Sequence, residues 1–211
     1  MLIIFDLDGT LIDSSKDLAL AMNATRLHVG MEPLEPNLIF SYVGNGAAML
    51  VRRALGPQAS EELVHEALVF FLKFYRMHAL EHTQLYPDIR ELLEELSRAE
   101  HKLAILTNKP ARISFDILGA LRLASHFVRV YGGDSLTAKK PDPLGITTLL
   151  TETGFSAANA LMVGDSGVDV LTARNAGVRS CGVTWGFQPE SLQSDPPDIL
   201  LNAPLELLSY I

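Results

Sequence analysis

The sequence predicts an α/β fold with a parallel sheet and an all-helical insertion near its N-terminal end. Short apolar runs alternate with helical patterns, and each run ends in a polar or glycine-rich turn, as buried parallel strands do. One long stretch between the first two runs shows helical periodicity and no convincing strand. The apolar runs cover residues 2–5, 103–106, 128–131, 161–163 and 181–184.

The insertion is expected to span residues 14–82, which leaves residues 1–13 and 83–211 for the α/β core domain. A first helix is predicted over 17–29, and the prolines at 33 and 36 are expected to break the chain. Two further helices are predicted over 47–55 and from the capping residue Ser60 to about Ala79. In the core, apolar residues repeat with helical spacing from Ile89 to Leu96, and Gly177 should end a helix that covers 169–176.

Composition narrows the classes of function. The chain has 211 residues, 48% of them hydrophobic, which is enough to bury a substantial core. A formal net charge of -8 argues against sequence-independent binding to nucleic acid. No apolar run approaches the length of a membrane span or a signal peptide, and the single cysteine, Cys181, cannot form an internal disulfide. We therefore expect a cytoplasmic protein that binds neither membrane nor nucleic acid.

Chemically active residues follow the predicted strands. Ligands of an open parallel sheet bind beyond the carboxyl ends of its strands, so these residues should meet at one edge. The segments are Asp6-Leu7-Asp8-Gly9-Thr10, Thr107-Asn108-Lys109, Lys139-Lys140-Pro141-Asp142-Pro143 and Gly164-Asp165-Ser166 with Asp169.

Together these residues supply the parts that phosphoryl transfer requires. Asp6 is the candidate nucleophile, and Asp8 can protonate the leaving alcohol and later deprotonate a water molecule. Thr107 and the backbone N–H of Asn108 can donate to phosphoryl oxygens, while Lys140 supplies a positive charge.

Crowded carboxylates at this edge also predict a magnesium site, because Mg²⁺ prefers hard oxygen ligands. The expected metal residues are Asp6, Asp8, Asp165 and Asp169. Asp169 also stands where a helix begins, so it either supports the metal or caps that helix. Ser166 is likewise either a helix cap or a partner of Asp165.

The four segments resemble the motifs of the haloacid dehalogenase superfamily. Their residues are similar to those of its phosphoglycolate phosphatase branch. The resemblance implies a Rossmann-like core, a mobile helical cap, Mg²⁺, and hydrolysis of a small phosphorylated metabolite, 2-phosphoglycolate first, through an aspartyl phosphate on Asp6. Asp8 argues against dehalogenation, since dehalogenases of the superfamily lack this second acid. Residues 43–46 resemble the substrate-facing cap loop. The resemblance implies substrate binding by Gly9, Asn45, Gly46, Asn108 and Lys109.

Several alternatives stay open at this stage. The substrate could be a sugar phosphate, a nucleotide or pyrophosphate, or the protein could be a phosphomutase similar to β-phosphoglucomutase. A non-enzymatic phospho-acceptor domain would share the acidic cluster but would not need the insertion. A serine hydrolase is disfavoured because Val168 occupies the last glycine position of the GxSxG pattern and no histidine follows Ser166.

The sequence does not single out one partner for a substrate carboxylate. The loop 43–46 has no basic residue for a substrate carboxylate, so Lys16, Arg52 and Lys109 are unranked candidates. The oligomeric state, monomer or homodimer, is also left open. The aromatic residues expected to form the core of the helical bundle are Phe70, Phe71, Phe74 and Tyr75.

Overall fold

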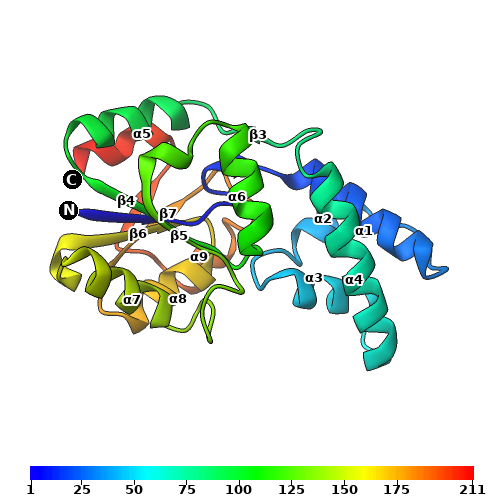
Figure 1. Ribbon diagram of the computed structural model, residues 1–211. Helices are drawn as coiled ribbons and strands as arrows, with labels where there is room; N and C mark the ends of the chain where they lie inside the picture. Colours follow the sequence, from blue (N-terminus) through cyan, green and yellow to red (C-terminus); the bar gives the residue numbers. More distant parts are fainter.

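The fold is an α/β domain with a helical layer beside it (Figure 1). A computed structural model describes all 211 residues. Six parallel strands form the sheet in the order β5-β4-β1-β6-β7-β8. The strands are β1 (Leu2–Phe5), β4 (Lys102–Leu106), β5 (Phe127–Tyr131), β6 (Ala160–Gly164), β7 (Arg179–Val183) and β8 (Ile199–Leu201).

Apolar residues on both faces of the sheet are buried by helices, which explains the continuous hydrophobic runs of the strands. On β1, Ile3 and Phe5 pack into one cluster with residues of α5 (Ile89–Arg98) and α6 (Ala111–Ala120). Leu2 and Ile4 point to the other face, against residues of α7 (Leu144–Thr153) and α8 (Gly167–Asn175). The predicted sheet and its core helices are therefore confirmed.

The helical insertion lies between β2 (Ile12–Asp13) and β3 (Gln84–Leu85), which pair with each other as a small antiparallel ribbon. Its helices are α1 (Ser15–His28), α2 (Pro36–Phe40), α3 (Ala47–Leu55) and α4 (Glu61–His78). Ser60 caps α4 as predicted, because its hydroxyl accepts a hydrogen bond from the N–H of Leu63 at 3.2 Å. Figure 1 shows these four helices gathered on one side of the sheet.

A buried carboxylate joins the two connections between insertion and core. Asp17 accepts hydrogen bonds from the N–H groups of His82 (3.0 Å) and Thr83 (2.9 Å) and from the Thr83 hydroxyl (2.8 Å). Burial alone would raise the pKa of Asp17, but these hydrogen bonds outweigh it and lower the pKa below its usual range. An ionised carboxylate thus links the start of the insertion, at Asp17, to its end, at His82 and Thr83.

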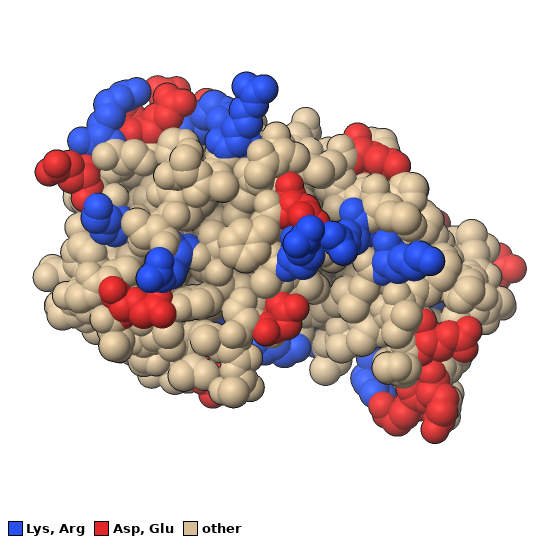
Figure 2. Space-filling view, viewed as in Figure 1, with Lys and Arg blue, Asp and Glu red and all other residues tan.

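The structure differs from the predictions at a few elements. Pro36 does not break the chain there but occupies the first position of α2, where its missing N–H costs nothing. The strands β2, β3 and β8 were not predicted, and Thr184 lies outside β7. None of the helices combines the length and apolar character needed to cross a bilayer. Figure 2 shows both acidic and basic side chains on the face in view, with several basic side chains close together near its middle.

Candidate active site

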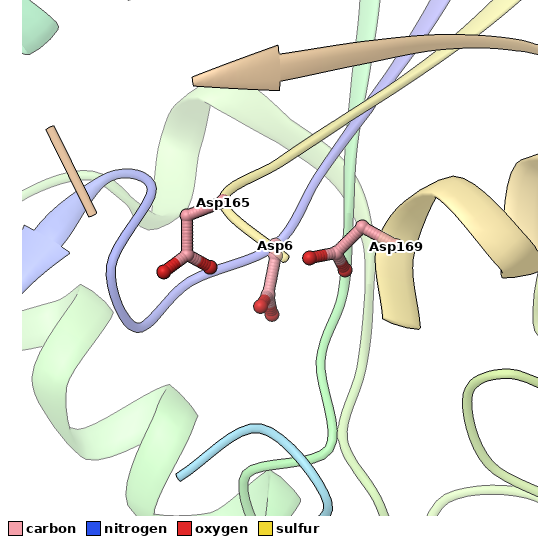
Figure 3. Close-up of side chains that lie close together, drawn as sticks. All are labelled: Asp6, Asp165 and Asp169. Carbon is pink, nitrogen blue, oxygen red and sulfur yellow. The ribbon is translucent and has the colours of Figure 1, made fainter. Parts of the chain in front are cut away.

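Three carboxylates converge at the carboxyl edge of the sheet (Figure 3). Asp6 follows β1, Asp165 follows β6, and Asp169 stands in the first turn of α8. One oxygen from each lies within 4.8 Å of the others, and all three residues are buried. The parallel topology therefore brings together three of the four residues that the sequence assigns to a metal.

Glycines make room for this cluster. A Cβ atom on Gly9 would lie 2.3 Å from Asp165 Oδ2, and one on Gly186 would lie 2.2 Å from Asp165 Cβ. A Cβ on Gly164 would lie 2.2 Å from Asp169 Cγ. Gly9 also has a φ of +78°, which side-chain-bearing residues rarely adopt. The role of Gly9 is thus to let Asp165 approach the strand end, and it is not among the residues that line the cavity described below.

Lys140 is the cation of the cluster. Its Nζ donates to Asp169 Oδ1 at 2.5 Å and lies 2.9 Å from Asp6 Oδ1, and its side chain is only 2% exposed. Burial alone would lower the pKa of Lys140, but the carboxylates of Asp169 and Asp6 raise it above its usual range. Lys140 is therefore a permanent positive charge beside the candidate nucleophile.

Asp169 has two roles, and Ser166 has one. Asp169 Oδ2 accepts hydrogen bonds from Ser166 Oγ (2.7 Å) and from the Ser166 N–H (3.2 Å), an arrangement typical of a helix start. Its other oxygen holds Lys140. Ser166 is thus a partner of Asp169 and makes no hydrogen bond to Asp165.

Electrostatics of the cluster favour a divalent cation. Burial raises the pKa of Asp6 to about 6, partly opposed by Lys140, and burial together with Asp169 and Asp6 raises the pKa of Asp165 well above its usual range. When all three carboxylates are ionised, they and the one ammonium leave two negative charges in a buried site. A hard divalent ion such as Mg²⁺ would neutralise them with the oxygen ligands it prefers. The residues present therefore fit this metal.

Asp8 stands apart from the three-carboxylate cluster. Its carboxylate accepts hydrogen bonds from the Ser14 hydroxyl at 2.5 Å and from Lys109 Nζ at 2.8 and 2.9 Å. Lys109 Nζ also donates to the hydroxyl of Tyr75, on α4, at 2.5 Å. Burial raises the pKa of Tyr75 to about 12, so the hydroxyl stays protonated. The carboxylate of Asp8 is thus held by Ser14 and Lys109 and is not among the three clustered carboxylates.

A small cavity covers this edge of the sheet, between the core and the insertion. Its volume is about 50 Å³, room for roughly three to five water molecules at 10–15 Å³ each. Asp6, Asp8, Asp165, Thr107, Asn108 and Lys109 line it from the core, and Gly44, Gly46, Phe71 and Tyr75 line it from the insertion. Phe71 and Tyr75, which the helical spacing assigns to the bundle core, therefore also belong to the site.

Side chains of the core donate hydrogen bonds to backbone carbonyls of the insertion's loop, residues 41–45. Asn108 Nδ2 donates to Gly44 O at 2.8 Å, and Lys139 Nζ donates to Asn45 O at 2.9 Å. Gln188 Nε2 donates to Val43 O at 2.7 Å and to Ser41 O at 3.1 Å. Asn45, an expected substrate-binding residue, does not line the cavity. Its observed contact is this carbonyl.

The loop after β7 was missed by sequence reasoning. The N–H of Phe187 donates to Asp165 Oδ2 at 2.7 Å, and the neighbouring Gln188 makes the contacts to the insertion. This loop therefore connects a cluster carboxylate with the segment above the cavity. No local pattern marks it, because its contacts are made by a backbone N–H and a neutral amide.

Comparison with known proteins identifies the family. A family model described as haloacid dehalogenase-like hydrolase matches residues 3–183. The chain belongs to this family.

Similar proteins cover 94–100% of this haloacid dehalogenase-like hydrolase. Phosphoglycolate phosphatase of Vibrio vulnificus strain CMCP6 is 39% identical over 100% of this chain and 95% of its own. The enzyme of the same name from Neisseria gonorrhoeae is 41% identical over 94% of this chain and 88% of its own. The crystal structure of a predicted phosphoglycolate phosphatase from Haemophilus somnus 129PT matches with a TM-score of 0.93 at 32% identity, covering 99% of this chain and 96% of that one. The predicted family and α/β fold are confirmed.

The three basic residues considered as partners of a substrate carboxylate occupy different environments in this hydrolase. Arg52 forms a surface ion pair with Glu61 at 2.5 Å, and its side chain is 42% exposed. Lys16 is exposed and lines a separate groove with Phe40 and His82. Only Lys109 lies in the cavity above the carboxylates.

Proposed function

We propose that this protein is a magnesium-dependent phosphatase that hydrolyses a small phosphomonoester through an aspartyl phosphate on Asp6, with 2-phosphoglycolate as its substrate. The observation that carries the proposal is the meeting of Asp6, Asp8, Thr107 and Lys140 beneath one small cavity. Asp6 and Asp8 follow β1, Thr107 follows β4, and Lys140 lies in the loop between β5 and α7. Together they supply nucleophile, acid, donor and cation.

In the first step, a carboxylate oxygen of Asp6 attacks phosphorus and the bond from phosphorus to the ester oxygen breaks. Asp8 gives its proton to the departing oxygen, which leaves as the alcohol. Thr107 and the N–H of Asn108 donate to the phosphoryl oxygens, and Lys140 balances the negative charge beside Asp6.

In the second step, Asp8 takes a proton from a water molecule, whose oxygen attacks phosphorus. The bond between phosphorus and Asp6 breaks, inorganic phosphate leaves, and the Asp6 carboxylate is restored. The same residue thus serves as acid and then as base.

Asp6 and Asp165, with Asp169 beside them, would hold Mg²⁺, which supplies charge neutralisation between the nucleophile and the phosphate when bound. The insertion above the cavity would act as the cap, limiting both bulk water and substrate size. The name shared by the similar enzymes supports 2-phosphoglycolate.

The test is phosphate release from 2-phosphoglycolate, hexose phosphates, nucleoside monophosphates and pyrophosphate, each with Mg²⁺ and with a chelator. We expect magnesium-dependent turnover with 2-phosphoglycolate preferred, and none after Asp6→Asn. Asp116→Asn, which alters an exposed ion pair with Arg76 on the surface, is the matched control. Preference for another ester would refute the substrate, and transfer of the phosphoryl group to a sugar instead of water would indicate a mutase.

A further inference from the structure

Lys109 is the one cation among the residues that line the cavity. Three carboxylates, those of Asp6, Asp8 and Asp165, line it as well, so the cavity is negatively charged. An ester whose alcohol part is also an anion would be repelled from such a space unless a cation met that second charge. Lys140 lies at the nucleophile, where a divalent ion would also be held, on the phosphate side.

Lys109 is fixed in position. Its side chain is 2% exposed, and its Nζ lies 2.8 Å from Asp8 Oδ1 and 2.9 Å from Asp8 Oδ2. The hydroxyl of Tyr75 accepts from it at 2.5 Å, and the Tyr75 ring centroid lies 4.5 Å from Nζ. A buried, held ammonium loses little freedom when it binds a ligand, so it can select strongly for charge.

We propose that Lys109, held by Tyr75, selects phosphate esters whose alcohol carries a carboxylate on the carbon next to the ester oxygen. This inference rests on the proposed function, because it assumes that Asp8 protonates that oxygen. A general acid must come within about 2.6–3.2 Å of the oxygen it protonates. In 2-phosphoglycolate the carboxylate is attached to the carbon that bears this oxygen. A group so close to the ester oxygen is within reach of the ammonium beside Asp8.

The contacts of Lys109 place its ammonium where this carboxylate would lie. An ammonium has three N–H donors, and here two face the oxygens of Asp8 and one faces Tyr75. The positive charge is thus held directly beside the carboxylate of Asp8, and a substrate carboxylate that lies there would share one of these donors.

The experiment compares 2-phosphoglycolate with 2-hydroxyethyl phosphate, which has the same length but a neutral end. In Lys109→Met, the ratio of the two kcat/KM values should fall roughly 10- to 100-fold, the usual loss for one charge-assisted hydrogen bond. Tyr75→Phe should lower the ratio by a smaller factor. Lys16→Met and Arg52→Met, at the two other basic residues considered, should leave it unchanged.

The comparison of two substrates distinguishes two roles of Lys109: selecting a substrate carboxylate and positioning Asp8. If Lys109 only positions Asp8, Lys109→Met slows both esters equally and the ratio stays constant, which overturns the inference. If the wild-type protein shows no preference for 2-phosphoglycolate over the neutral ester, the proposed substrate fails instead.

A binding measurement keeps the inference testable if Lys109→Met is inactive. The phosphonate 3-phosphonopropionate replaces the ester oxygen by carbon and cannot be hydrolysed, and propylphosphonate lacks its carboxylate. Calorimetry with Mg²⁺ should show that wild-type protein prefers the former and that Lys109→Met loses this preference. Retention of the preference in a folded Lys109→Met protein overturns the inference.

Discussion

Replacing Gly9 with alanine should displace Asp165 and weaken magnesium binding. The new Cβ would lie 2.3 Å from Asp165 Oδ2, whereas ordinary contacts begin near 3.4 Å. The carboxylate oxygen would therefore have to move by about 1 Å, while metal ligands tolerate deviations of only about 0.2 Å. Since even changes in the groups that support a metal ligand cost about 10- to 100-fold in affinity, we expect at least that loss.

A second glycine separates the effect of backbone strain from that of the collision with Asp165. Gly9 has a φ of +78°, so alanine there also adds backbone strain, about 1–2 kcal/mol. Gly154 has a φ of +74°, and a Cβ atom added there would meet nothing within 4 Å, so Gly154→Ala adds the strain without the collision. Gly154→Ala should therefore lose roughly 2–8 °C in Tm, at about 2–4 °C per kcal/mol, and Gly9→Ala should lose at least as much.

Titration of phosphate release with Mg²⁺, beside thermal unfolding of each variant, tests this reasoning. Gly9→Ala should need at least about 10-fold more Mg²⁺ for half-maximal rate, and Gly154→Ala should match the wild type. An unchanged magnesium requirement in folded Gly9→Ala would show that Asp165 does not hold the metal.

Two other variants test the contacts of Asp17 with residues 82 and 83 and the contacts of Gln188 with the loop of the insertion. Asp17→Asn should cost about 1–3 kcal/mol in the free energy of unfolding, since it weakens charge-assisted hydrogen bonds. Because the pKa of Asp17 is lowered from 3.8, this stabilisation is complete above that pH and lost below it, so the Tm values should converge in acid. A difference in Tm between the wild type and Asp17→Asn that persists at low pH would show that the ionised carboxylate is not what stabilises the fold. Gln188→Leu should raise KM for 2-phosphoglycolate more than it lowers kcat, because Val43 and Ser41 lose their donor. Gln193→Leu on the exposed surface is the kinetic control, and equal KM values would refute a role for Gln188.

The sequence predicted the sheet and the residues at its carboxyl edge because both depend on local patterns. A run such as Leu2 to Phe5 is buried on both faces of a sheet, so its apolar character is continuous. Asp6, Thr107 and Asp165 follow such runs directly. Parallel pairing then brings them to one edge whatever the details of packing.

Elements that depend on distant partners were missed. β2 and β3 have two residues each and exist as strands because they pair across the whole insertion. β8 has three residues at the edge of the sheet, too few to show a period. Tyr75 has the helical spacing of a bundle residue, and only the docking of α4 against the core brings its hydroxyl to Lys109. Gln188 and Phe187 act through an amide and a backbone N–H, which no residue pattern distinguishes.

In the proposed mechanism, Asp6 carries the phosphoryl group during turnover. Acid quenching of the protein during turnover of 2-phosphoglycolate with Mg²⁺, followed by peptide mass spectrometry, tests it most directly. One added phosphoryl group is expected on the peptide that contains Asp6, sensitive to hydroxylamine as acyl phosphates are and absent in Asp6→Asn. Normal phosphate release by Asp6→Asn, or a phosphoryl group found on another residue, would contradict it.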